Sequence, residues 1–338
     1  MKVFAFRNEK RVEEKSSSGG AFMAVIDAAF KLCKTGGGGS ESVTIYGAVF
    51  NNDLEVVHSK ATTIAECEKF HGSKYVLSSM GQNYKEVEID LLSGKCVLFS
   101  GTPCQVAAIK SFLNKKHIPL ENFYTIDIIC HGAPGKKLWA DYREWIQKKN
   151  RSSLSEFSFR YKKARWKLYP CMARFENGKM KINTQDVRVY TTLFFTHLAY
   201  RECCYSCKYA DIQREGDITL GDFWGFENVM PTVSARWKIK AEDGVSLVLV
   251  NSSKGKTLWD LVLSNQERCL IEECTSGEFI KYQHNLVSPT EKPKRIEEFR
   301  EDYKNHDFNY IAQKYAHYDL KGKIRFILSR IYHEWFQL

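Results

Sequence analysis

The sequence contains no run of about 18 apolar residues, so we expect no transmembrane helix. The first residues, Met1 to Lys15, are charged and lack the apolar stretch of a secretory signal. We therefore expect a cytoplasmic protein, in which cysteine thiols stay reduced.

The sequence also lacks a nucleic-acid-binding motif and internal repeats. Its formal net charge of +10 can attract phosphorylated ligands or anionic lipid, although a solvated basic surface explains the charge equally well. We expect no nucleic-acid partner. Lys321–Leu338 alternates basic and apolar residues, so it can lie on a membrane surface as a peripheral contact or pack on its own domain.

Helical and strand patterns alternate along the chain. Apolar residues at helical spacing predict a helix over Ala21–Lys34. Short apolar runs predict strands over Val43–Phe50, Lys95–Ser100 and Tyr124–Ile129. This alternation predicts an α/β fold with a mixed sheet and flanking helices, with α+β as the alternative.

The chain divides by composition into two predicted units. Residues 1–275 carry the motifs described below, and residues 276–338 are helical in pattern and basic. Gly36–Ser40 indicates a flexible linker, either a natural glycine turn or an engineered replacement of a loop.

Cysteine is plentiful in this sequence. Its 11 cysteines are an odd number, which in a cytoplasmic chain favours a metal site or catalysis over a disulfide framework. Six have no second cysteine or histidine at ligand spacing, and we expect them to be core residues. These six are Cys33, Cys67, Cys96, Cys171, Cys269 and Cys274.

Four other cysteines are candidate metal ligands. Cys204 and Cys207 form a CxxC pair, a spacing that suits zinc, a redox dithiol or an iron–sulfur cluster. Cys104 and Cys130 each follow a predicted strand, at the sheet edge where α/β proteins bind ligands. Together they would complete a 4Fe–4S site, and Cys203 is an alternative to its neighbour Cys204.

Two small-residue loops are candidate anion sites. Ser16–Gly20 leads directly into the predicted helix, an arrangement that presents backbone N–H groups to an anion. An ordinary serine cap on that helix is the alternative. Gly72–Tyr75 is a second loop, with a cation and an aromatic ring.

Five motifs together resemble those of the coenzyme F420 hydrogenase/dehydrogenase beta-subunit family. They are SSSGGAF at 16–22, HGSKYVLSSMG at 71–81, VLFSGTPCQVAAI at 97–109, DIICHGAP at 127–134 and CYSCKYADIQREGDITLGDFWG at 204–225. The resemblance implies a flavoprotein, with FAD or alternatively FMN, that passes electrons between the flavin and iron–sulfur clusters.

One departure from that family bears on the partner. Many members begin with a ferredoxin-like segment rich in cysteine repeats, whereas this chain begins almost directly at the serine loop. The resemblance therefore implies a separate ferredoxin or another electron donor.

The resemblance also gives the loops expected roles. Lys74 would stabilise a reduced, anionic flavin, and His131 would tune the cluster or move a proton, unless it is an ordinary loop histidine. Tyr75 or Trp224 would stack on a ring, and Asp222 would orient an arginine or a ribose hydroxyl, unless it caps a helix. The expected cofactor-binding residues are Ser16, Ser17, Ser18, Gly19, Gly20, Gly72, Ser73, Lys74, Tyr75, Gly101, Thr102, Gln105, Asp222 and Trp224.

These features predict an oxidoreductase that transfers electrons from ferredoxin or reduced F420 to a substrate. The resemblance to standalone family members implies a nucleotide- or lipid-linked sugar intermediate in cell-surface polysaccharide biosynthesis as that substrate. A zinc-binding, non-catalytic interaction module at the membrane surface is the alternative. The sequence is compatible with a homo-oligomer.

Overall fold

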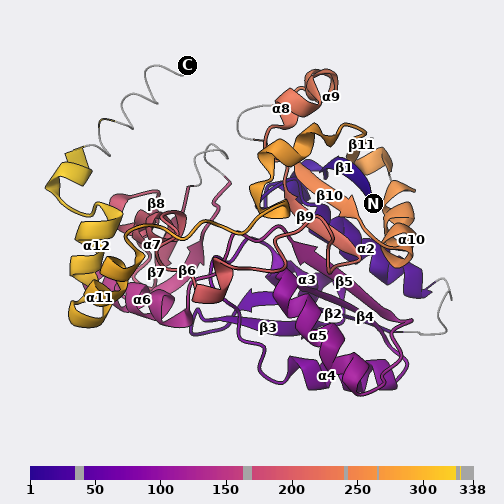
Figure 1. The fold of residues 1–338 in the computed structure, drawn as a ribbon, viewed down its shortest axis with the longest axis horizontal. Helices are drawn as coiled ribbons and strands as arrows, with labels where there is room; N and C mark the ends of the chain where they lie inside the picture. The colour runs from indigo at the N-terminus through magenta and orange to yellow at the C-terminus, as the bar shows by residue number, and fades with distance from the viewer. Residues whose placement is uncertain (35–41, 163–169, 240–242, 265, 325–327, 329–338) are drawn as a thin grey trace.

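The computed structural model describes residues 1–34, 42–162, 170–239, 243–264, 266–324 and 328. Figure 1 shows these residues as two lobes. The large-sheet lobe contains an eight-stranded sheet and its covering helices. The small lobe consists of residues 136–195 together with 296–316, and it contains a three-stranded sheet.

The large sheet is mixed, which confirms the predicted fold class. Its strand order is β11-β1-β10-β9-β5-β4-β2-β3, and β2, β4, β5 and β9 run parallel to one another. The remaining pairings are antiparallel. The strands are β1 (Lys2–Arg7), β2 (Val43–Phe50), β3 (Val56–Ala61), β4 (Cys96–Gly101), β5 (Phe123–Ile128), β9 (Ile218–Asp222), β10 (Ser246–Val250) and β11 (Leu270–Glu273).

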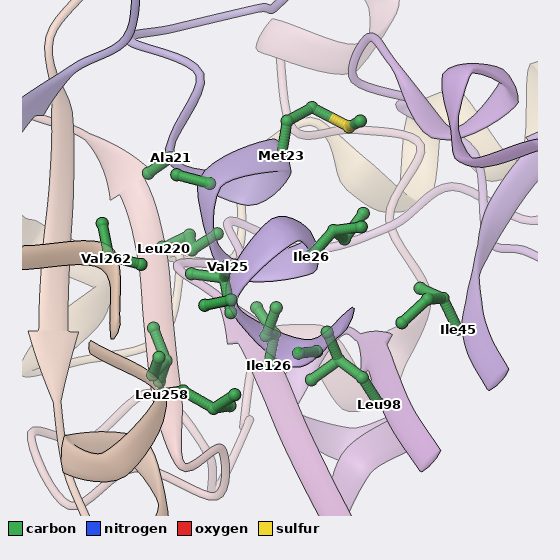
Figure 2. Close-up of a cluster of buried hydrophobic side chains, with 14 of the residues drawn as sticks. Ala21, Met23, Val25, Ile26, Ile45, Leu98, Ile126, Leu220, Leu258 and Val262 are labelled. Atoms are coloured by element: carbon green, nitrogen blue, oxygen red, sulfur yellow. The ribbon is translucent and has the colours of Figure 1, made fainter. Parts of the chain in front are cut away.

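Helices cover both faces of this sheet because its strands bury side chains on both sides. On one face, α2 (Ala21–Lys34) and α10 (Ser253–Leu263) lie side by side. Figure 2 shows Val25 and Ile26 of α2 packed towards Leu98 and Ile126 of the strands. On the other face, α4 (Asn83–Leu92) and α5 (Pro103–Lys115) bury their apolar residues against alternate strand positions. Each fully buried aliphatic side chain contributes about 1.5–3 kcal/mol.

The small lobe has an aromatic core of its own. Trp139, Tyr142, Phe159 and Tyr190 are fully buried and lie within contact of one another. Its elements are α6 (Lys136–Asn150), β6 (Leu154–Ser158), β7 (Met172–Phe175), β8 (Met180–Ile182), α7 (Gln185–Phe195), α11 (Ile296–Asn305) and α12 (Phe308–Ala316).

The C-terminal helices α11 and α12 belong to this aromatic core. Phe299 and Ile311 are buried in the same cluster as Trp139. A separate unit at 276–338 stays a prediction. Its helices α11 and α12 share their core with residues that lie far earlier in the chain.

Short helices connect the larger elements. They are α1 (Lys10–Glu13), α3 (Ile64–Cys67), α8 (Phe226–Val229) and α9 (Pro231–Trp237), with 3-10 turns at Glu68–Phe70, Glu202–Cys204, Gln266–Arg268, Gly277–Tyr282 and His284–Leu286. Gly36–Ser40 and most of Lys321–Leu338 lie outside the described residues. Among the helices that the structure describes, none is long and apolar enough to cross a membrane.

Candidate functional site

The parallel strands bring several predicted residues to one edge of the large sheet. Cys104 lies in the first turn of α5, directly after β4. Cys130 follows the end of β5 by two residues, and Asp222 is the last residue of β9. Because β4, β5 and β9 are parallel neighbours, their carboxyl ends share this edge, where open α/β sheets bind ligands.

A capping box fixes the start of α5 beside Cys104. The Gln105 side-chain oxygen accepts from the Thr102 N–H at 3.0 Å, and its Nε2 donates to Ser78 Oγ at 2.9 Å. The Thr102 hydroxyl lies 3.1 Å from the Cys104 sulfur. These contacts hold the first turn of α5, with its thiol, in one orientation.

The segment with Cys204 and Cys207 is tied to the chain that follows β5. The Arg201 N–H donates to the Ala133 carbonyl at 3.2 Å, and Pro134 pairs with Tyr200 as an isolated bridge. The segment therefore begins within hydrogen-bonding distance of the Cys130 loop.

Arg214 ties the other end of this segment. Its guanidinium donates to the carbonyls of Tyr209 at 3.1 Å, Asp211 at 3.0 Å and Ile128 at 3.1 Å. It also forms an ion pair of 3.2 Å with Asp127, and the two side chains are 1% and 0% exposed. Arg214 thus connects the loop after Cys207 to the end of β5, just before Cys130.

The segments that carry the four candidate ligands meet at this edge. The pKa of Cys130 is raised to about 12, chiefly by burial and in smaller part by the nearby thiols of Cys104, Cys204 and Cys207. The charges of these three thiols therefore act on Cys130, and the cysteine segments are neighbours at this edge of the sheet. Cys203, by contrast, is exposed, and the Arg201 guanidinium, 3.1 Å from its sulfur, also interacts with Cys204.

The chemistry of this donor set fits a metal centre. Four thiols from three chain segments suit a 4Fe–4S cluster or a four-cysteine zinc ion. Within the described residues, no three His, Cys, Asp or Glu side chains are grouped closely enough to surround a single metal ion. Of the six cysteines expected in the core, five are buried and Cys269 is half-buried beside Asn8.

The two predicted anion loops also meet. The Ser73 N–H donates to Ser17 Oγ at 2.7 Å, which joins the loops directly. The Ser16 and Ser18 hydroxyls donate to the carbonyls of Val12 and Val245 at 2.8 and 2.9 Å. These two hydroxyls therefore hold the loop in place.

Gly19 allows the serine loop to lie against the large sheet. A Cβ at this position would be 2.2 Å from the Phe6 carbonyl oxygen and 2.6 Å from the Ser246 nitrogen. No side chain fits there without moving β1 or β10. The loop thus reaches the sheet by direct backbone approach, as the glycines in the motif suggest.

Lys74 is a cation in a confined place. Burial lowers the pKa of its ammonium to about 7. Its Nζ donates to the carbonyls of Phe70 and His71 at 3.1 and 2.9 Å, and no carboxylate among the described residues forms an ion pair with it. An anion bound beside such a lysine would stabilise its charged form.

The two candidate stacking rings differ in their surroundings. Tyr75 stacks on Phe194 at 4.5 Å between ring centroids, so one of its faces is covered. Trp224 lines a cavity of about 270 Å³ with Asp243 and Tyr282, close to the lower end of the range for small-molecule sites. Trp224 therefore contributes part of its surface to this cavity, whereas Tyr75 does not line it.

Arg160 connects these residues across the lobes. It donates to Asp222 at 3.0 Å and to the Tyr75 hydroxyl at 3.3 Å, and it lies over the Trp224 ring at 5.9 Å. A second small-lobe cation, Lys162, donates to the Ser18 carbonyl at 2.5 Å.

His131 lies on the exposed side of the site. The surrounding protein lowers the pKa of its imidazole, and Asp222 opposes that effect in part. Its carbonyl accepts from the Thr290 hydroxyl. The residue as a whole is exposed to solvent, although burial of the imidazole is the main cause of its lowered pKa.

Sequence reasoning missed Arg160, Lys162 and Arg214. Arg214 lies in the sequence QREGD, between the CxxC pair and the next strand. Its position inside a family motif could have indicated a role at the site. Arg160 and Lys162 follow an aromatic strand without any local pattern, and only the fold brings them to the site.

The family comparison matches more than half of the chain. Residues 94–273 match the family model for the C terminus of the coenzyme F420 hydrogenase/dehydrogenase beta subunit. The chain belongs to this family. The matched residues of the F420 hydrogenase/dehydrogenase beta-subunit family include all four candidate cysteines, whereas the loops at 16–20 and 72–75 lie outside them.

A solved structure supports the family's fold over nearly the whole chain. The similar chain is from a xenon-derivatized structure of the F420-reducing [NiFe] hydrogenase complex from Methanosarcina barkeri. The match has a TM-score of 0.54 and 15% identity, and it covers 90% of this chain and 91% of that chain. No curated protein sequence matches.

Proposed function

We propose that this chain is an oxidoreductase that binds a 4Fe–4S cluster through Cys104, Cys130, Cys204 and Cys207 and a flavin, FAD or FMN, at the adjacent loops. The observation that carries the proposal is that backbone and Arg214 contacts tie the Cys204–Cys207 segment to the Cys130 loop, at the sheet edge where Cys104 begins α5. The family description, which names a hydrogenase/dehydrogenase, favours a redox centre over a zinc ion.

When bound, a flavin exchanges two electrons and a cluster exchanges one at a time, so the pair couples two-electron and one-electron steps. The protein's own residues prepare the site. The Cys130 thiol, with its pKa near 12, must lose its proton to bind iron, and a metal cation makes that loss favourable. Arg214 and the Thr102 capping box hold the cysteine segments in position.

The joined loops give the proposed flavin site its anchors. Lys74 would place an ammonium beside the anionic part of the flavin, next to the contact between Ser17 and Ser73. The Trp224 ring, which lines the cavity, would stack on an aromatic system. His131 would exchange a proton with solvent at the exposed side.

The electron donor that we propose is ferredoxin or reduced F420. The proposed substrate is a nucleotide- or lipid-linked sugar intermediate, and it rests on family association alone. Reoxidation of the anaerobically reduced protein by such sugars tests the substrate separately. A protein that contains both cofactors but is not reoxidised by any of these sugars would contradict the substrate and leave the cofactor proposal intact.

Two adjacent cysteines provide the main test. We expect anaerobically purified wild type to contain about four irons and four sulfides per chain. The change Cys204→Ser should remove most of the iron, whereas Cys203→Ser should retain it, because Cys203 is exposed and turned towards Arg201. Iron, sulfide and flavin assays on the three proteins measure this.

Two results would contradict the proposal. If the purified protein is colourless and contains stoichiometric zinc, the site binds a structural zinc ion and not a cluster. A full iron content in Cys204→Ser with iron loss in Cys203→Ser would reverse the assignment of the two neighbours.

A further inference from the structure

A basic groove runs between α5 and the segment that follows Cys207. Its volume is about 720 Å³, and Lys110, Lys115, Lys208, Tyr209 and Glu215 are among the residues that line it. The Lys110 ammonium donates to the Glu215 carbonyl, which joins the two walls. This feature, the α5 groove, has no role in the site described above.

The walls of the α5 groove carry two of the four candidate ligands. Cys104 lies in the first turn of α5, and Lys110 lies further along the same helix. Lys208 is the residue after Cys207. The groove is therefore close to two of the candidate ligands. Helix α5 connects it to Cys104, and one peptide bond connects Lys208 to Cys207.

The groove has surplus positive charge. Lys115 and Lys208 are exposed. No carboxylate within the described ranges forms an ion pair with either of them or with Lys110. Glu215 and the nearby exposed Asp211 are the opposing charges, so the cations outnumber them.

The next lysine along α5 is different. Lys116 forms an ion pair of 2.8 Å with Glu88 and lies over the Phe112 ring. Its charge is already compensated, whereas the charges in the groove face solvent.

We propose that the α5 groove is the docking surface for a small acidic electron-carrier protein of the iron–sulfur class. The proposal rests on the proposed function, because the carrier would deliver its electron to the cysteine-bound cluster. In each encounter the carrier is oxidised by one electron and the cluster is reduced by one, so two encounters supply a two-electron reduction at the flavin.

The form of the surface suits such a carrier. Complementary charge accelerates encounter by factors of about 10 to 1,000, and this gain falls with salt. Electron-transfer complexes are typically small and short-lived, so an open groove with few apolar groups is sufficient. Tyr209, an aromatic ring in the groove, is covered by the Lys208 ammonium at 5.1 Å, which disfavours base stacking by a nucleic acid.

The test compares two charge reversals in the full chain. One protein carries Lys115→Glu and Lys208→Glu, and the matched control carries Lys116→Glu at the end of the same helix. The probe is an acidic bacterial ferredoxin. Anaerobic stopped-flow records the reduction of the cofactors by reduced ferredoxin, and fluorescence anisotropy records binding of the oxidised, labelled carrier.

We expect the groove variant to be reduced by ferredoxin on the order of tenfold more slowly at low salt, with a flatter salt dependence. Binding of the oxidised carrier should weaken in parallel. Lys116→Glu should behave as wild type. Iron content and photoreduction by 5-deazariboflavin should be equal in all three proteins, which shows that folding and the cofactors are intact.

The outcomes separate the two proposals. If wild type contains the cluster and 5-deazariboflavin reduces it, equal ferredoxin rates in wild type and the groove variant would overturn the docking surface alone. Loss of oligonucleotide binding in place of ferredoxin binding would also overturn it, in favour of a nucleic-acid surface. Absence of iron from wild type would overturn the proposed function, and the docking proposal with it.

Discussion

At the scale of the residue, Lys74 is a buried cation whose charge depends on its surroundings. Burial lowers its pKa from 10.5 to about 7, so its ammonium is easily lost near neutral pH. A bound anion favours the charged form and raises this pKa again. Binding of an anionic ligand and protonation of Lys74 are therefore linked.

The sign of this linkage gives a prediction. Below about pH 7 Lys74 is already charged, so flavin affinity should be nearly constant. Above about pH 7 the free protein must take up a proton to bind, and affinity should fall by up to about tenfold per pH unit. Titration of the apoprotein with FAD, followed by flavin fluorescence between about pH 6 and pH 9, measures this.

Two variants serve as controls. Lys74→Met should bind FAD more weakly and without the fall above about pH 7, whereas Lys69→Met, an exposed neighbour, should retain it. His71 remains in both variants. Burial lowers its pKa and the Lys74 charge lowers it further, so the pKa of His71 should rise when Lys74 is removed. A pH dependence that persists in Lys74→Met would therefore assign the effect to His71.

At the scale of the element, Arg214 joins a loop to a strand. Its ion pair with Asp127 is buried, and burial raises the pKa of this carboxyl while Arg214 lowers it in part. Removal of one partner leaves the other charge buried without compensation. Such a loss typically costs about 3–5 kcal/mol.

We predict that Arg214→Met lowers the free energy of unfolding by about 3–5 kcal/mol at neutral pH. The loss should shrink in acid, because the stranded Asp127 carboxyl is then protonated in both the folded and the unfolded state. The double variant with Asp127→Asn should recover part of the loss. Urea unfolding at two pH values measures these differences, and an equal loss in single and double variants would contradict the charge argument.

Individual elements were predictable from sequence where their pattern was complete. Ala21–Lys34 and Val43–Phe50 were predicted at the bounds that the structure shows, because turn residues flank an amphipathic helix and an apolar strand. The strand Lys2–Arg7 was not predicted. Its apolar run is short and has charged residues at both ends, so the pattern is weak. The run is buried because β10 and β11 pair with it on either side.

The site was predictable only in part for a similar reason. Cys104 and Cys130 follow strands, and the parallel arrangement of those strands places them together. Arg160 and Arg214 act on residues 62 and 86 positions away, so no local pattern reveals them. The pairing of β5 with β9 brings Arg214 to the end of β5, and the packing of the small lobe on the large sheet brings Arg160 to Asp222.

At the scale of the whole molecule, buried polar contacts connect the small lobe to the large sheet. Arg160, with a side chain 3% exposed, pairs with Asp222 at the end of β9. The Tyr190 hydroxyl donates to the Tyr75 carbonyl at 2.8 Å. These contacts place the small lobe against Tyr75 and the end of β9.

We predict that Asp222→Asn lowers the free energy of unfolding by about 3 kcal/mol, because it leaves the Arg160 charge buried. It should also expose the junction between the lobes to limited proteolysis. Glu156→Gln, which breaks an exposed pair with Arg174, should change stability by no more than about 0.5 kcal/mol. Equal effects of the two changes would show that Arg160 is satisfied by other partners.

The bridge between Pro134 and Tyr200 has a consequence for the unfolded chain. Cys130 and Cys204 stand just outside this bridge, at the two ends of the segment that forms most of the small lobe. A cluster that holds both cysteines would close that segment into a ring of roughly 75 residues, and the chain-entropy model assigns such a closure about 4 kcal/mol. The proposed redox centre would then also act as a crosslink, and its loss would loosen a lobe that contributes none of its ligands.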